Sequence, residues 1–118
     1  MKKKDIVKNN REFENIISTG QQVKNKNFII YYKKNKEQKT RFGISVGKKL
    51  GNAVFRNKYK RKIRAIIDNN KNDCLKGYDY IIILRGSADT LKYNELNTAY
   101  ISLNKYIRKE QNNEQKEQ

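Results

Sequence analysis

The middle of the chain has an unusual charge pattern: residues 41–67 contain nine Lys or Arg and no Asp or Glu. In soluble helices, acidic residues commonly stand three or four positions from basic ones, where each pair contributes about 0.2–0.5 kcal/mol. Here the charge that balances these cations, Arg41 included, is not expected to be local. The whole chain of 118 residues carries 28 Lys and Arg against 12 Asp and Glu, a formal net charge of +16. Because repulsion among so many like charges opposes compaction, a polyanionic partner is the natural explanation.

Nucleic acid is the first candidate for this partner, and an anionic membrane surface is the second. The longest apolar runs are Phe28–Tyr32 and Tyr80–Leu84, far short of the ~20 residues that a spanning helix needs. The basic residues 1–5 lack the apolar core of a signal peptide. Cys74 is the only cysteine, so no intramolecular disulfide is possible. We therefore expect a cytoplasmic protein with no membrane partner.

Hydrophobic periodicity divides most of the chain into six expected elements. In chain order these are a short helix from the cap Asn10 to Gly20, strands at Phe28–Lys33 and Arg41–Val46, a helix from the cap Asn52 to about Asp68, a strand at Tyr78–Arg85, and a helix at Leu91–Arg108. The order α-β-β-α-β-α predicts an α/β (α+β) sandwich with a single small mixed sheet. The first two strands are close enough in sequence to pair as a hairpin.

The length fits one domain, which we expect to span residues 1–108. Residues 109–118 contain no apolar side chain to bury. They are predicted to be a disordered polar tail.

The helix predicted after Asn52 has an apolar and a basic face at 100° per residue. The apolar stripe is formed by Phe55, Tyr59, Ile63 and Ile66, and the neighbouring basic row by Arg56, Lys60 and Arg64, with Asn57 and Arg61 beside it. Side chains four residues apart on a helix are about 6 Å apart, so such a row can follow a phosphate backbone. Lys48, Lys49 and two glycines precede the helix, where exposed backbone N–H groups favour anions. A basic helix face is often only solvated surface, but the acid-free run favours contact with RNA or DNA.

The block from Gly47 to Arg64, Gly-Lys-Lys-Leu-Gly-Asn-Ala-Val-Phe-Arg-Asn-Lys-Tyr-Lys-Arg-Lys-Ile-Arg, closely resembles the signature of bacterial ribonuclease P proteins. The resemblance extends through Phe13, Gly20, Phe28–Tyr31, Phe42–Val46 and Asp79–Ile83. Two positions depart from the family pattern. Lys58 replaces the third member of an Arg-Asn-Arg trio, which keeps the charge but loses the bidentate fork of arginine. Ile17 stands where the family often has an aromatic residue.

The resemblance implies a left-handed βαβ crossover and two RNA-binding surfaces. The first surface meets the catalytic RNA of ribonuclease P, and the matching residues are Lys48, Lys49, Asn52, Arg56, Asn57, Lys58, Lys60, Arg61 and Arg64. The second is a cleft for the single-stranded 5′ leader of precursor tRNA, and the matching residues are Phe13, Ile17, Ile29, Tyr31 and Lys33. The family's protein is a subunit of a tRNA-processing endoribonuclease, expected as a monomer in a 1:1 ribonucleoprotein. Pattern alone does not decide which face of the strand Phe28–Lys33 is core.

The residues themselves favour a protein without catalytic groups. The chain has no histidine, the usual general base near neutral pH. The acidic residues are scattered, and Glu37–Lys39, a faint echo of a nuclease motif, falls in a turn. We expect no catalytic residue and no metal or cofactor bound by the protein, with Mg²⁺ used by the RNA subunit. Two other classes remain open: a structural RNA-binding protein such as a ribosomal protein, and an autonomous protein nuclease.

Overall fold

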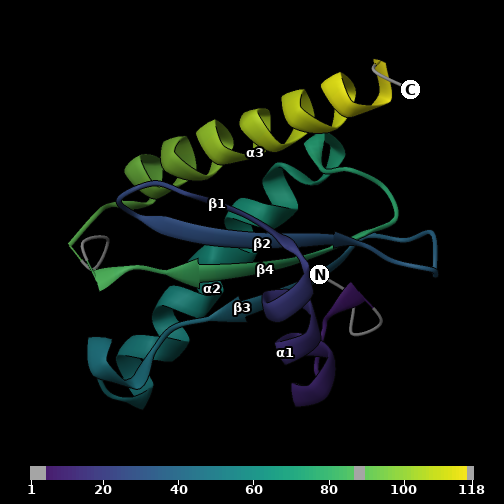
Figure 1. Cartoon of the computed structure of the whole chain (residues 1–118). Helices are drawn as coiled ribbons and strands as arrows, with labels where there is room; N and C mark the ends of the chain where they lie inside the picture. The colour runs from purple at the N-terminus through teal and green to yellow at the C-terminus, as the bar shows by residue number, and fades with distance from the viewer. Residues whose placement is uncertain (1–4, 87–89, 117–118) are drawn as a thin grey trace.

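Alternating apolar residues build a four-stranded mixed sheet that carries helices on both faces (Figure 1). The computed structural model describes residues 5–86 and 90–116. The elements are α1 (Asn10–Thr19), β1 (Gln21–Lys24), β2 (Phe28–Lys34), β3 (Arg41–Ser45), η2 (Lys48–Leu50), α2 (Ala53–Asn69), η3 (Lys71–Asp73), β4 (Tyr78–Leu84) and α3 (Tyr93–Lys116). The predicted α+β class is confirmed. Within the described ranges, no helix is long and apolar enough to cross a bilayer.

The strand order is β1-β2-β4-β3, so the predicted hairpin between β2 and β3 is wrong. Strand β4 lies between them, antiparallel to β2 and parallel to β3, and α2 connects β3 to β4. Ile81 and Ile82 point to opposite faces of β4 and are both fully buried. A strand that is apolar on both faces is most stable in the centre of a sheet, where both faces are covered.

The hairpin in the structure pairs β1 with β2, and β1 was not predicted. Of its four residues only Val23 is buried. A short edge strand with one buried side chain leaves almost no periodic signal in the sequence.

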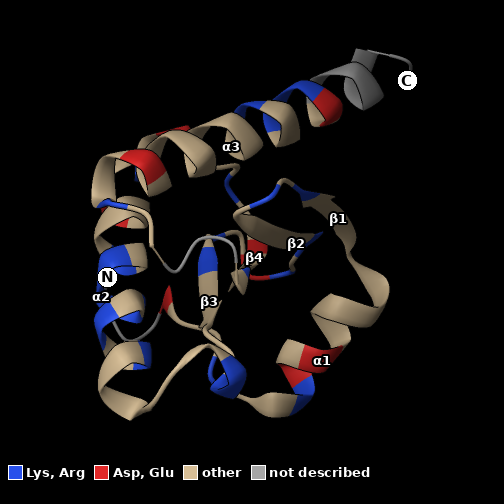
Figure 2. Ribbon diagram, turned by 90° about the vertical axis from the view of Figure 1, so that its left-hand side faces the viewer, with Lys and Arg blue, Asp and Glu red and all other residues tan. Residues whose placement is uncertain are grey.

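The main core lies between one face of the sheet and the helices α2 and α3 (Figure 2). Strand β2 contributes Phe28, Ile30 and Tyr32, which settles the face that the sequence left open. The apolar stripe predicted for α2 is confirmed, and α3 turns a similar stripe into this core. The buried helix residues are Tyr59, Ile63, Ile66 and Ile67 of α2 and Leu96, Ala99, Tyr100, Leu103 and Ile107 of α3.

A smaller cluster lies on the opposite face of the sheet, beneath α1. Ile16 of α1 and Ile81 of β4 are its buried centre, together with Val7. Phe13 packs against Gly43 of β3, where an added Cβ would stand 2.7 Å from the Phe13 ring. The glycine therefore allows α1 to lie close to the sheet.

The ends of two helices differ from the prediction. Helix α1 is capped by Asn9, whose side chain accepts a hydrogen bond from the Arg11 N–H, rather than by Asn10. Helix α3 continues to Lys116 instead of ending at Arg108, so the expectation of disorder from residue 109 is wrong for residues 109–116. Gln111 is buried there without being apolar, because Tyr78 donates to its Oε1 at 2.7 Å and its Nε2 donates to Gln21.

Candidate nucleic-acid interface

Two neighbouring residues fix the start of α2. The Asn52 side chain accepts a hydrogen bond from the Phe55 N–H at 3.0 Å, which confirms the predicted N-cap. At Gly51 an added Cβ would stand 2.5 Å from the Phe55 ring. A side chain there would push the ring out of place, so glycine is needed for the approach of η2 to the helix.

One stripe of α2 is anchored by aromatic packing. The rings of Phe55 and Tyr59 lie 4.5 Å apart, and Tyr59 is buried. Lys62 places its Nζ 4.8 Å from the centroid of the Tyr59 ring, a cation–π contact. This packing sets the rotation of the helix and therefore the direction of its basic face.

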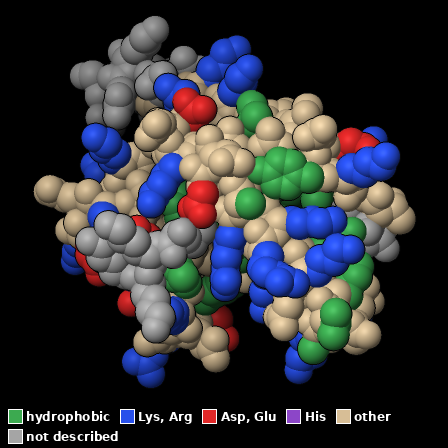
Figure 3. Space-filling view, turned by 180° about the vertical axis from the view of Figure 1, so that it is seen from behind, with side chains coloured by type: hydrophobic (Ala, Val, Ile, Leu, Met, Phe, Trp, Pro, Cys, Tyr) green, Lys and Arg blue, Asp and Glu red, His purple; other side chains and the backbone are tan. Residues whose placement is uncertain are grey.

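The side of α2 that points away from the sheet carries the predicted cations (Figure 3). A surface hollow of about 480 Å³ is lined by Val54, Asn57, Lys60, Arg61 and Arg64. Lys48 and Lys49 are exposed in η2, just before the helix. Within residues 5–86 and 90–111, none of these Lys and Arg side chains forms an ion pair with an acidic side chain. We call the set Lys48, Lys49, Arg56, Asn57, Lys60, Arg61 and Arg64 the α2 basic face.

Arg56 of this face, and Asn52 and Lys58 outside it, have distinct surroundings. Arg56 is half-buried and donates from Nε to the Asn52 carbonyl oxygen at 3.4 Å, which draws its guanidinium toward the helix start. The Asn52 side chain is engaged in capping. Lys58 is exposed, but at 100° per residue it lies about 160° from Lys60. It therefore projects from the other flank of the helix.

Val54 is a residue of this surface that the sequence reasoning missed. Its side chain is 76% exposed, and it lines the hollow beside Asn57. A helical wheel could have identified Val54, because it lies opposite the apolar stripe and so cannot pack into the core.

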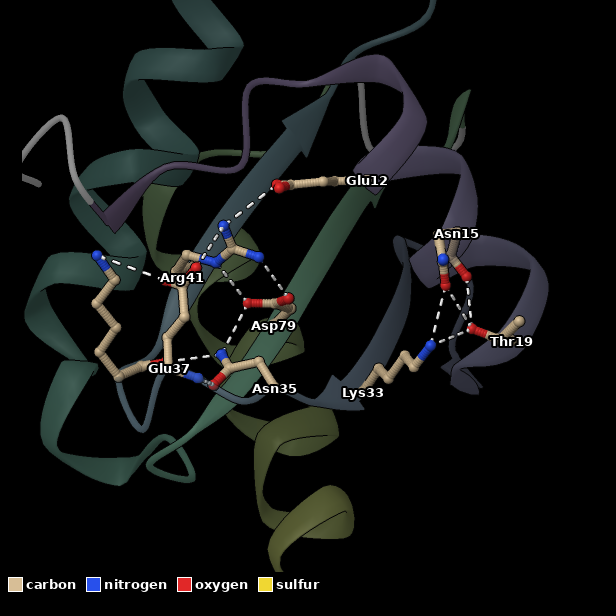
Figure 4. Close-up of polar contacts among 9 residues, drawn as sticks. Glu12, Asn15, Thr19, Lys33, Asn35, Glu37, Arg41 and Asp79 are labelled. Atoms are coloured by element: carbon tan, nitrogen blue, oxygen red, sulfur yellow. Dashed lines mark hydrogen bonds and ion pairs between the residues drawn. The ribbon is translucent and has the colours of Figure 1, made fainter.

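Arg41 departs from the expectation that no cation of residues 41–67 is balanced within the fold (Figure 4). Its guanidinium donates to both carboxylate oxygens of Asp79, at 2.9 and 2.8 Å, and to Glu12 at 3.2 Å. Glu37 stands 3.9 Å away. The hydrogen bonds to Asp79 hold the pKa of Arg41 above its ordinary value. For Arg41 the prediction is wrong, because strand pairing brings a carboxylate 38 residues away into contact.

The predicted leader residues lie on the face of the sheet that carries α1. Phe13, Ile17 and Tyr31 are half-buried members of the cluster around Ile81, and Ile29 is a half-buried neighbour on β2. Tyr31 is half-buried, and its hydroxyl accepts a hydrogen bond from Gln22 at 3.0 Å. The structure thus brings the four apolar residues together on one partly open surface, which we call the α1 sheet face.

Lys33 lies at the end of the same face. Its Nζ donates to Asn15 Oδ1 at 2.9 Å and to Thr19 Oγ1 at 2.7 Å, both on α1 (Figure 4). The sequence did not indicate that Asn15 and Thr19 would hold the Lys33 side chain. No local signal links them to a lysine 14 or 18 residues later.

The described residues contain no group of three or more His, Cys, Asp or Glu side chains that could hold a metal ion. Cys74 is half-buried, and burial raises the pKa of its thiol, so the thiolate needed for nucleophilic chemistry is disfavoured.

Comparisons with known proteins agree with the geometry. Residues 1–108 match the family model described as Ribonuclease P. The ribonuclease P protein component of Mycoplasma capricolum is 47% identical over 109 residues, which cover 92% of this chain and 100% of the relative. A Staphylococcus aureus RNase P protein, a mutant with defective mRNA degradation activity, superposes with a TM-score of 0.83 at 37% identity and 90% coverage of each chain. The RNase P protein from Thermotoga maritima superposes with a TM-score of 0.79 at 30% identity, covering 85% of this chain and 94% of that one.

Proposed function

The chain belongs to the ribonuclease P protein family, and we propose that it binds the RNA subunit of ribonuclease P and the 5′ leader of precursor tRNA. As a ribonuclease P protein it is a subunit of a tRNA-processing ribonuclease. The proposal concerns which surfaces meet RNA and what each one does.

The observation that carries the proposal is the α2 basic face. Its cations are exposed or half-buried, turned to one side, and not neutralised by acidic side chains of the described chain. Lys and Arg that meet phosphates displace condensed counterions, a favourable contribution that depends on salt. The missing negative charge is therefore supplied by the RNA subunit. Lys58, on the other flank, is a candidate for contact with a separate part of that RNA.

The α1 sheet face suits an unpaired strand. Aromatic side chains stack on bases with little sequence preference, contributing about 1–3 kcal/mol per base. Tyr31 and Phe13 offer such rings, with Ile17 and Ile29 as apolar neighbours and Lys33 at the end. We assign this surface to the leader.

Hydrolysis is assigned to the RNA subunit with its Mg²⁺ ions. The role of the protein is to hold the leader and to screen phosphate repulsion between the two RNAs, as a monomer in a 1:1 complex. A cytoplasmic location, expected from the sequence, remains a prediction.

The test is reconstitution of the holoenzyme with a bacterial ribonuclease P RNA at low Mg²⁺. Addition of the protein should restore removal of the 5′ leader. The variant Arg64→Ala should bind the RNA subunit more weakly. Its slope of the logarithm of the binding constant against the logarithm of the salt concentration should be shallower by about 0.9 or less. Lys105→Ala, an exposed cation on α3, is the matched control and should behave like the parent.

Two other functions make different predictions. A structural RNA-binding protein of the ribosomal kind needs no leader surface, so equal affinity for precursor and mature tRNA would favour it. The relative from Staphylococcus aureus is described in terms of mRNA degradation activity, which makes RNA cleavage by the protein alone worth measuring. Processing of precursor tRNA without the RNA subunit would favour a protein nuclease.

A further inference from the structure

Arg41 and Lys33 are cations of the same sheet face that are held in opposite ways. In the sheet, Asp79 of β4 stands opposite Lys33 of β2 on one side and opposite Arg41 of β3 on the other. Arg41 is neutralised by the carboxylates of Asp79 and Glu12. Among the described residues, Lys33 is held by the neutral oxygens of Asn15 and Thr19 and by no carboxylate (Figure 4). The ammonium of Lys33 is therefore fixed in position with its charge uncompensated by either partner.

An ammonium group has three N–H donors, and these two partners take two of them. The third remains for a further acceptor. Fixing a flexible lysine in advance lowers the entropy lost when it binds a ligand. The arrangement is suited to an anion rather than to another cation.

A hollow of about 230 Å³ adjoins this ammonium, lined by residues that include Asn15, Lys33, Lys34, Lys36, Arg41 and Asp79. A water molecule takes about 30 Å³ in the liquid, so the hollow has room for a phosphate group. Its lining holds four cations against two carboxylates, and both carboxylates bond to Arg41. Lys34 and Lys36 are exposed and form no ion pair within the described part of the chain.

The hollow continues the α1 sheet face. Lys33 and Tyr31 point to the same side of β2, about 7 Å apart along the strand. This is close to the step between successive nucleotides of an extended strand. A base stacked on Tyr31 would place a neighbouring phosphate near Lys33.

We propose that this hollow is a phosphate subsite for single-stranded RNA, in which Lys33, Lys34 and Lys36 bind one backbone phosphate of the leader next to the nucleotide on Tyr31. The inference rests on the proposed function, because it assumes that the leader occupies the α1 sheet face. It assigns to Lys34 and Lys36 a binding role that neither the charge pattern nor the basic helix indicated.

The experiment uses the assembled holoenzyme and precursor tRNAs with one uncharged methylphosphonate linkage in the leader, moved one nucleotide at a time. With the parent protein, a methylphosphonate at one linkage should weaken binding of the precursor tRNA more than a methylphosphonate at the neighbouring linkages. The double variant Lys34→Gln/Lys36→Gln should bind the unmodified precursor about tenfold more weakly. A plot of the logarithm of its binding constant against the logarithm of the salt concentration should be shallower by up to about 0.7, the value for one single-strand phosphate, because Lys33 remains.

The decisive measurement combines the two changes. In the double variant, which keeps Lys33, the methylphosphonate at the sensitive linkage should cause a clearly smaller loss than with the parent protein, while the control Lys105→Gln keeps the full loss. If every linkage retains its parental effect in the double variant, the subsite is wrong although the leader surface stands. If the parent protein itself binds precursor and mature tRNA equally, the proposed function fails together with the subsite. Both lysines are exposed, so thermal unfolding at the parental temperature verifies that the variant is folded.

Discussion

Arg41 and Asp79 face each other as register partners on the parallel strands β3 and β4, joined by two hydrogen bonds of 2.9 and 2.8 Å. Asp79 also accepts from Asn35 at 2.9 Å, and Arg41 reaches Glu12 of α1. One ion pair thereby links two strands, the loop before β3 and the helix over the α1 sheet face. Its geometry is bidentate, the strongest form of a charge-assisted pair.

Removal of the arginine leaves the Asp79 carboxylate, 6% exposed, without its cation. Arg41→Ala should lower the free energy of unfolding by about 3–5 kcal/mol, the usual cost of breaking a buried pair from one side. Urea denaturation measures the change. Glu12→Ala is the matched comparison and should cost about 1 kcal/mol or less, since the Glu12 side chain is 47% exposed and screened by solvent. Equal losses for the two variants would contradict a dominant role for Asp79.

The Phe13 ring of α1 packs against β3 at Gly43. In Gly43→Ala the new methyl group would stand 2.7 Å from both Phe13 and Ile81, so we expect a loss of about 1–3 kcal/mol from overpacking. Gly47→Ala is the control, because an added Cβ there meets nothing within 4 Å. It should stay within about 0.5 kcal/mol of the parent. A stable Gly43→Ala protein would show that α1 moves freely relative to the sheet.

Tyr31 allows stacking to be separated from hydrogen bonding. Tyr31→Ala should weaken holoenzyme binding of precursor tRNA by about 1–3 kcal/mol, the stacking energy of one base, and leave affinity for mature tRNA unchanged. Tyr31→Phe loses the hydrogen bond from Gln22 but keeps the ring, so it should bind precursor like the parent. Equilibrium binding to both RNAs measures the effect. Equal weakening for precursor and mature tRNA would point to misfolding rather than to a lost leader contact.

Alkaline pH should destabilise the protein through buried acids of the main core. Burial raises the pKa of Cys74, Tyr80 and Tyr100 above the ordinary values of 9.0 for cysteine and 10.0 for tyrosine. Above those values the unfolded chain loses protons that the folded protein retains, so stability is complete below pH 9.0 and falls as the pH rises further.

The free energy of unfolding across this range tests the prediction when the parent is compared with Cys74→Ala. The variant should lose less stability between pH 9.0 and 10.0, while any effect of lysine deprotonation is common to both proteins. Parallel curves would show that the thiol does not contribute.

Local patterns in the sequence were sufficient for most single elements. The cap at Asn52, the buried stripe through Tyr59 and Ile63, and the outward direction of the α2 cations follow from a 3.6-residue period, which needs only neighbours along the chain. The family signature lies in the same segment. The helical element and the basic surface were therefore predictable together.

Strand order, the face of β2 that becomes core, and the partners of Arg41 and Lys33 were decided by the tertiary structure. Strand β4 enters between β2 and β3 from more than 30 residues away, and its arrival places Asp79 beside Arg41. Docking of α1 on the opposite face then holds Lys33. The order of amino acids along the chain specifies which residues are apolar and which are charged. Only the folded sheet decided which charges are cancelled, because a pairing between distant segments depends on the whole chain and not on the residues near either partner.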